Sequence, residues 1–152
     1  GLKFPNGMAL SADEAHLFCA QTSDADVMRF AILPGAKLGP GERYGPALGK
    51  LQEPGGAQVA MHDLGYTDGV GMDAEGNLWV CLPAANKVVA ITPALEVITV
   101  IDDPSGEVVN HQTNITWGGP DLKDLYIGSI RAGYVLKGRS PVAGQPHVHQ
   151  LA

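Results

Sequence analysis

Three polar side chains, Asn6, Asp68 and Asn114, occupy the same point of three similar segments of the sequence. Amide and carboxylate oxygens are the ligands that hard divalent cations prefer in proteins. If the three segments repeat around one axis, these side chains converge on that axis and can form a cation site. Taken singly, Asn6-Gly7 and Asp68-Gly69 are more typical of ordinary turns, because both dipeptides suit residues at positive φ.

The similarity extends well beyond these positions. Each unit begins with a strand of small residues, continues through a polar turn, and reaches a second strand that reads Leu, aromatic, then β-branched or Cys. A third apolar strand follows ten residues after that Leu, and a fourth is clearest at residues 97–101. The units open at positions 6, 68 and 114, so the spacings are 62 and 46 residues. A four-stranded propeller blade takes about 40–50 residues.

The repeat therefore predicts an all-β fold, with residues 1–152 forming part of a β-propeller whose blades start near 5, 67 and 113. The longer first spacing is assigned to a Gly- and Pro-rich loop insertion at about 33–65, and residues from about 139 to 152 are assigned to a C-terminal tail. A β-sandwich is the alternative, but it predicts no repeat, and no amphipathic helix of ten residues supports an α/β fold. Three blades cannot close a ring.

Composition excludes several classes of partner. The net charge is −6 and no basic cluster is present, which argues against nucleic acid. No apolar run approaches the ~18 residues of a membrane helix. Cys19 and Cys81 lie in apolar runs, which predicts two buried free thiols in a reducing compartment. We therefore expect a cytoplasmic protein that binds neither nucleic acid nor membranes.

At this point three stretches resemble a known family: Phe4-Pro5-Asn6-Gly7-Met8, residues 66–80, and Trp117-Gly118-Gly119 with residues 125–127. They are similar to the senescence-marker-protein, gluconolactonase and luciferin-regenerating-enzyme family, which includes regucalcin. The resemblance implies a six-bladed propeller, of which this chain is the C-terminal half with three four-stranded blades. It also implies one divalent cation on the axis (Ca, Zn, Mg or Mn), with Asn6 and Asp68 matching two ligands. The third family ligand, a Glu of the first blade, has no matching position here.

The function that this resemblance implies is that of a metal-dependent hydrolase, a lactonase that opens sugar lactones or similar cyclic esters. A cation with open coordination positions can polarise the ring carbonyl and lower the pKa of bound water. By family analogy, Asp68 also accepts the proton of the attacking water and is the catalytic residue. The resemblance assigns no ligand role to Asn114, which either binds substrate or forms hydrogen bonds with backbone groups. The expected partners are the lactone and the missing N-terminal half of the propeller or a second copy of the chain.

Two alternatives from other classes stay open: a calcium-binding or regulatory propeller without chemistry, and an interaction scaffold whose loops bind proteins. Several suggestive residues have plainer interpretations. His147-Val148-His149 is expected to be solvated tail rather than a metal pair, and His62 and His111 are expected to lie in loops between blades. Trp117 is expected to pack between blades. No nucleophile or phosphate-loop motif is found in the sequence.

Overall fold

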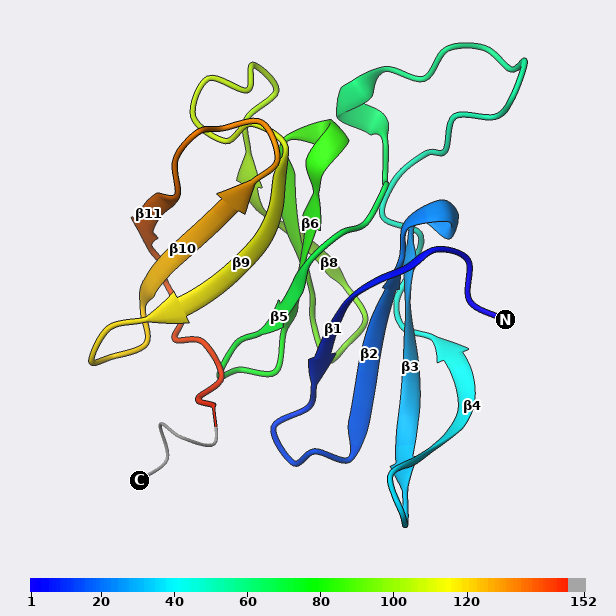
Figure 1. Ribbon diagram of the computed structural model, residues 1–152, viewed down its shortest axis with the longest axis vertical. Helices are drawn as coiled ribbons and strands as arrows, with labels where there is room; N and C mark the ends of the chain where they lie inside the picture. The colour runs from blue at the N-terminus through cyan, green and yellow to red at the C-terminus, as the bar shows by residue number, and fades with distance from the viewer. Residues whose placement is uncertain (148–152) are drawn as a thin grey trace.

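The computed structural model describes residues 1–147 as three antiparallel sheets arranged side by side like the blades of a fan (Figure 1). This confirms the all-β, partial-propeller prediction. Strand order within each blade follows the chain. Blade 1 contains β1 (Pro5–Leu10), β2 (His16–Gln21), β3 (Asp26–Leu33) and β4 (Lys37–Arg43); blade 2 contains β5 (Val70–Met72), β6 (Leu78–Leu82), β7 (Lys87–Ile91) and β8 (Val97–Asp102); blade 3 contains β9 (Gln112–Gly118), β10 (Asp124–Ser129) and β11 (Leu136–Arg139).

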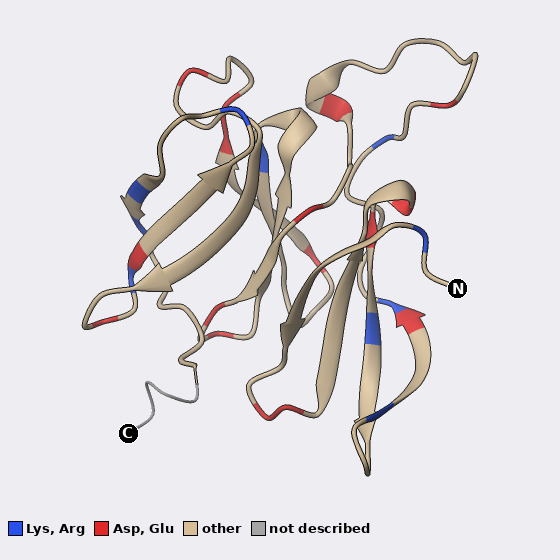
Figure 2. Ribbon diagram, in the orientation of Figure 1, with Lys and Arg blue, Asp and Glu red and all other residues tan. Residues whose placement is uncertain are grey.

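Helix is limited, in the described residues, to three single 3₁₀ turns at one end of the blades: η1 (Thr22–Asp24), η2 (Met61–Asp63) and η3 (Pro83–Ala85). No helix in residues 1–147 is long and apolar enough to cross a membrane. In Figure 2 the Lys and Arg residues are distributed over all three blades.

The sequence motif of blade 2 builds the turn between β5 and β6. The buried carboxylate of Asp73 accepts the backbone N–H groups of Glu75 and Asn77, each at 2.9 Å. The same carboxylate accepts the indole N–H of Trp79 at 2.9 Å. Gly76 completes the turn at a φ of 82°, in the left-handed region that favours glycine. Asp73 therefore serves as a structural anchor that fixes the aromatic side chain of β6.

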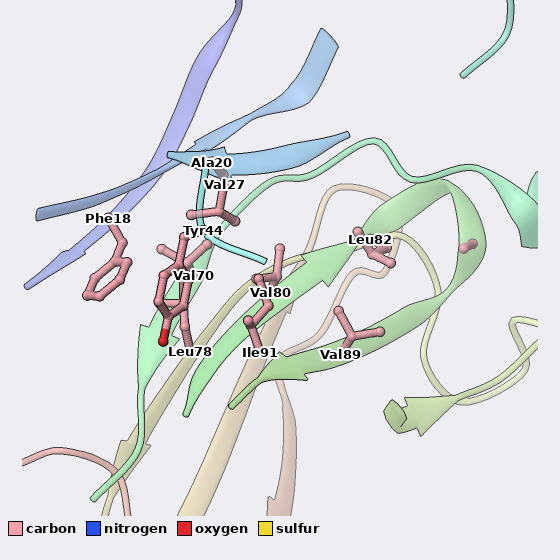
Figure 3. Close-up of a cluster of buried hydrophobic side chains, with 11 residues drawn as sticks. Phe18, Ala20, Val27, Tyr44, Val70, Leu78, Val80, Leu82, Val89 and Ile91 are labelled. Carbon is pink, nitrogen blue, oxygen red and sulfur yellow. The ribbon is translucent and has the colours of Figure 1, made fainter. Parts of the chain in front are cut away.

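Hydrophobic side chains between adjacent blades form two cores. The first joins blades 1 and 2 and includes the edge-to-face pair Phe18 and Tyr44, whose ring centroids are 4.8 Å apart (Figure 3). The second joins blades 2 and 3 and contains Trp79 and Trp117, with centroids 5.0 Å apart and an interplanar angle of 78°. Trp117 thus packs between blades, as expected. Both cysteines are buried and free.

The predicted loop insertion at 33–65 is wrong in its first part, because Lys37–Arg43 forms β4. This outermost strand is almost entirely exposed and pairs only with β3, so it has no apolar alternation to reveal it. A Cβ on Gly41 would lie 2.5 Å from the ring of Phe30, so an alanine there would displace that ring. Blade 3 has three strands in the described residues, where four were expected.

The expected C-terminal tail also begins as ordered structure. Residues 140–146, which we call the return segment, run back along the turns of blades 2 and 3. Gly144 donates its N–H to Leu122 O at 2.8 Å, and Gln145 donates to Met72 O at 2.9 Å. Ser140 is buried, and Gly144 leaves room for the Trp117 side chain. His149 lies outside the described residues.

Candidate metal and active site

The first residues of the inner strands meet through their backbones. Gly7 N–H donates to Asp68 O at 3.2 Å, and Gly69 N–H donates to Thr113 O at 2.8 Å. Neither glycine has a positive φ, so the turn interpretation of Asn6-Gly7 and Asp68-Gly69 is wrong. Both glycines are needed for close approach. A Cβ on Gly7 would lie 2.5 Å from Asp68 O and 2.7 Å from Gly69 Cα.

This close approach places the polar residue before each glycine beside its counterpart in the next blade. The Asn6 side chain lies close enough to the carboxyl of Asp68 to lower its pKa. Asn6 Nδ2 also donates to Thr22 Oγ1 at 3.2 Å, and Thr22 Oγ1 donates to Thr67 O at 2.7 Å. Because the amide nitrogen of Asn6 is held by Thr22, its oxygen is the atom left to bind a cation.

The environment of Asp68 changes its acidity. Partial burial raises the pKa of this carboxyl above its usual value, while the nearby Gly69 N–H and Asn6 side chain act in the opposite direction. Cys81 lies on the neighbouring strand, where its carbonyl accepts the Asp68 N–H at 3.0 Å. Burial and the charge of Asp68 together raise the pKa of the Cys81 thiol, so this sulfur stays protonated.

Asn114 lies at the corresponding place on β9, exposed and next to blade 2. Its Oδ1 accepts the Ile115 N–H at 2.9 Å, and a Cβ on Gly69 would lie 3.0 Å from that same oxygen. Its amide nitrogen has no hydrogen-bond partner among residues 1–147. The repeat departs from Asx-Gly here, because buried Ile115 stands where the other blades have glycine.

The remaining candidates lie elsewhere. His62 and His111 line a small cavity between loops, and His147 lines a larger one of about 710 Å³ along the later part of the inner strands. Neither Asn6 nor Asp68 lines the larger cavity, whose walls include apolar side chains of all three inner strands. Sequence reasoning did not identify Thr22, because nothing in its local sequence distinguishes it from an ordinary turn residue.

The donor set fits part of a hard-cation site. Asn6 and Asp68 offer an amide and a carboxylate oxygen at neighbouring positions. Within the described chain, no group of three or more His, Cys, Asp or Glu residues could hold a metal ion. The described residues therefore contribute one carboxylate, that of Asp68, and one side-chain amide, that of Asn6, to the candidate site.

The fold and this pair of oxygen donors define part of a β-propeller with a candidate cation site at the start of its inner strands. The sequence pattern of the SMP-30/gluconolactonase/LRE-like region matches residues 1–131. The chain belongs to this family.

Two curated relatives are similar over part of the sequence. Strictosidine synthase-like protein 13 of Arabidopsis thaliana is 29% identical over 100 residues, which is 65% of this chain and 19% of that protein. Regucalcin of Xenopus laevis is 33% identical over 74 residues, which is 48% of this chain and 23% of that protein. The matched segments thus span about a fifth of the length of these relatives.

Solved structures show the same fold. A luciferin-regenerating enzyme matches with a TM-score of 0.64 and 19% identity over 94% of this chain and 47% of that one. A gluconolactonase of Xanthomonas campestris matches at 0.60 and 23% identity, over 84% and 35% of the two chains. The calcium-binding protein regucalcin of Agrobacterium tumefaciens matches at 0.62 and 21% identity, over 85% and 39%. The described blades correspond to less than half of each propeller.

Proposed function

We propose that this chain supplies two ligands of a divalent cation in a lactonase that opens sugar lactones or similar cyclic esters. The observation that carries the proposal is the proximity of the Asn6 and Asp68 side chains, which the interblade bonds from Gly7 N–H to Asp68 O and from Thr22 Oγ1 to Thr67 O hold together at the start of the inner strands. Membership of the family and the likeness to a gluconolactonase favour this chemistry. The bound cation would polarise the lactone carbonyl and activate water.

Each side chain has a separate task in this proposal. Asn6 and Asp68 would bind the cation, each through one oxygen. The second oxygen of Asp68 would accept the proton of the attacking water, a step that typically contributes about 10²- to 10⁴-fold to the rate. In the metal-free chain, burial raises the pKa of this carboxyl. The amide nitrogen of Asn114 would donate to a substrate oxygen.

The whole site requires more chain than residues 1–152. We propose that the N-terminal half of a six-bladed ring packs against the free faces of blades 1 and 3 and provides the missing ligand. Apolar side chains are exposed along β1 and just before it: Phe4 is 64% exposed, Met8 63% and Leu10 41%. Surface of this kind in a soluble protein marks an interface. The alternative partner is a second copy of the chain. It would bring two Asn6 and two Asp68 side chains to the axis, but not the Glu ligand that the family resemblance implies.

The test uses the natural polypeptide that contains this sequence. Metal content is measured by mass spectrometry, and a panel of lactones is assayed with and without chelator. We expect Asp68→Asn to lose the metal and nearly all turnover, by about 100-fold or more. Glu96→Gln is the matched control, because it also changes an acid to its amide but lies exposed in the turn between β7 and β8.

The outcomes separate the candidate functions. Metal binding and chelator-sensitive turnover, both lost in Asp68→Asn, support the lactonase. Tight calcium binding without turnover on any lactone supports a calcium-binding protein, which the same oxygen donors would serve. No bound metal in the wild-type protein favours an interaction scaffold and contradicts the proposal. Light scattering on the natural polypeptide distinguishes one six-bladed monomer from a dimer of three-bladed chains.

A further inference from the structure

A second cavity, of about 270 Å³, lies between the loops of blades 2 and 3. Its walls come from η2, from the residues at the end of η3, from the loop between β8 and β9, and from Arg131 after β10. The backbone N–H of Asp68 donates to Cys81 O, just before η3. The backbone N–H of Gly69 donates to Thr113 O, just after His111. The cavity therefore lies at the same end of the propeller as the Asn6–Asp68 pair.

The ionisable residues that line this cavity are all potential cations: His62, His111 and Arg131. No carboxylate lines it, although the chain as a whole is acidic. Arg131 has no ion-pair partner among the described residues. A guanidinium group presents donors in a fixed planar fork that matches carboxylate and phosphate oxygens. The volume is below the usual range for whole ligands, which suits a single ionic group.

The acidic residues nearest the cavity are committed to other contacts. Asp103 accepts a hydrogen bond from Ser105 Oγ at 2.6 Å and backbone N–H groups at 2.8–3.1 Å from residues 106, 108 and 109. These bonds hold the pKa of Asp103 well below its usual value, so it stays charged within its own loop. Asp102 Oδ1 lies 3.7 Å from His62 Nε2, which leaves the other ring nitrogen of His62 for another partner.

Hydrogen bonds fix the cavity wall before any ligand arrives. Ser129 Oγ donates to Asn110 O and accepts the N–H of Arg131 at 3.0 Å, so the basic residue is tied to the opposite loop. Asn86 Oδ1 accepts the backbone N–H of His111 at 2.9 Å. His111 itself has a φ of 50°, a left-handed conformation that is uncommon for residues other than glycine. Such conformations are concentrated at functional sites.

One of the buried polar atoms that lack a partner belongs to a residue that lines this cavity. His62 Nδ1 is inaccessible to solvent and has no hydrogen-bond partner among the described residues. Buried polar atoms are nearly always hydrogen-bonded, so an exception needs an explanation. Because His62 lines the cavity, rotation of its side chain on ligand binding would supply the missing bond.

We infer that this cavity binds a small oxyanion, either a carboxylate or a phosphate group. Arg131 is its principal charged donor, and His62 and His111 are additional hydrogen-bond partners. The inference goes beyond the proposed lactonase function and does not rest on it, because it involves neither Asn6 nor Asp68.

The test is a titration of the natural polypeptide, freed of metal by chelation, with sodium phosphate and separately with sodium acetate at constant ionic strength. Binding is followed by thermal unfolding and by the imidazole C–H resonances in NMR spectra. We expect at least one of the two ions to raise the melting temperature and to shift the His62 and His111 resonances. Arg131→Gln should weaken binding by about 10- to 100-fold, the usual value of a charged hydrogen bond.

Lys37→Gln is the matched control, because it removes one positive charge from exposed β4 in blade 1 and should leave binding unchanged. Arg131→Lys keeps the charge but loses the fork, and should bind with intermediate affinity. Saturation by phosphate alone or by acetate alone identifies which group the site takes. The inference is overturned if neither ion shifts the two histidines, or if Arg131→Gln binds as tightly as Lys37→Gln does.

Discussion

Gly69→Ala should separate the inner strands of blades 2 and 3. The new Cβ would overlap Thr113 O and lie 2.9 Å from Asn114 Cα, and both obstacles are backbone that cannot rotate away. Overpacking of this kind costs about 1–3 kcal/mol, and loss of the Gly69 N–H bond to Thr113 O adds about 1 kcal/mol. The free energy of unfolding should fall by about 2–4 kcal/mol. At roughly 2–4 °C per kcal/mol, the melting temperature should fall by roughly 4–16 °C.

The control is Gly138→Ala in β11, where a Cβ meets nothing within 4 Å and φ is not positive. Alanine is favoured over glycine in a strand by roughly 0.5–1 kcal/mol, so this variant should be as stable as the wild type or slightly more so. Urea unfolding of both variants, followed by far-ultraviolet circular dichroism, measures the difference. If Gly69→Ala unfolds at the same urea concentration as Gly138→Ala, the glycine is not required for close approach, and the account of the Asx-Gly motif fails.

Three further measurements test other parts of the structure. Asp73→Ala leaves the indole N–H of Trp79 and the turn amides without an acceptor, so it should lower the free energy of unfolding in urea by about 2–4 kcal/mol. The raised pKa of Asp68 stabilises the metal-free protein below the ordinary pKa of 3.8, and this contribution is lost as pH rises through the raised value. Metal-free Asp68→Asn should therefore melt above the wild type at pH 7, and the gap should close near pH 4. Cys19 and Cys81 are buried with raised pKa values, so neither thiol should react with Ellman's reagent until urea unfolds the protein.

The architecture was predictable because a propeller repeats a local unit. The positions of Asn6, Asp68 and Asn114 relative to the following strands depend on short-range sequence, and β1, β5 and β9 begin within a few residues of the expected starts. The proximity of Asn6 and Asp68 follows from the same repetition. The metal ligation and catalytic role assigned to these residues stay predictions.

The errors have a common physical cause, which is that long-range contacts leave little trace in local sequence. β4 is exposed and held by one neighbour, so its residues show no alternation. Gly7 and Gly69 allow the close approach of strands that are far apart in the chain. The dipeptides Asn-Gly and Asp-Gly that contain them are equally typical of turns. Thr22 reaches Asn6 only after the blade has folded. The sequence alone could not identify the strand β4, the close-approach role of the glycines or the contact of Thr22, because each depends on residues that are distant in the chain.

The return segment has a consequence for how the blades come apart. In repeat architectures, each unit is held mainly by its nearest neighbours, so units can open one at a time. Residues 140–146 bond to the turns of blades 2 and 3 at once, through Ser140 N–H to Lys123 O and Gln145 N–H to Met72 O. Opening either blade breaks this shared segment, so the two blades behave as one cooperative unit in hydrogen exchange. Among residues 1–147, blade 1 has no such tie and can open first, which would release Asn6 while Asp68 stays in its folded place.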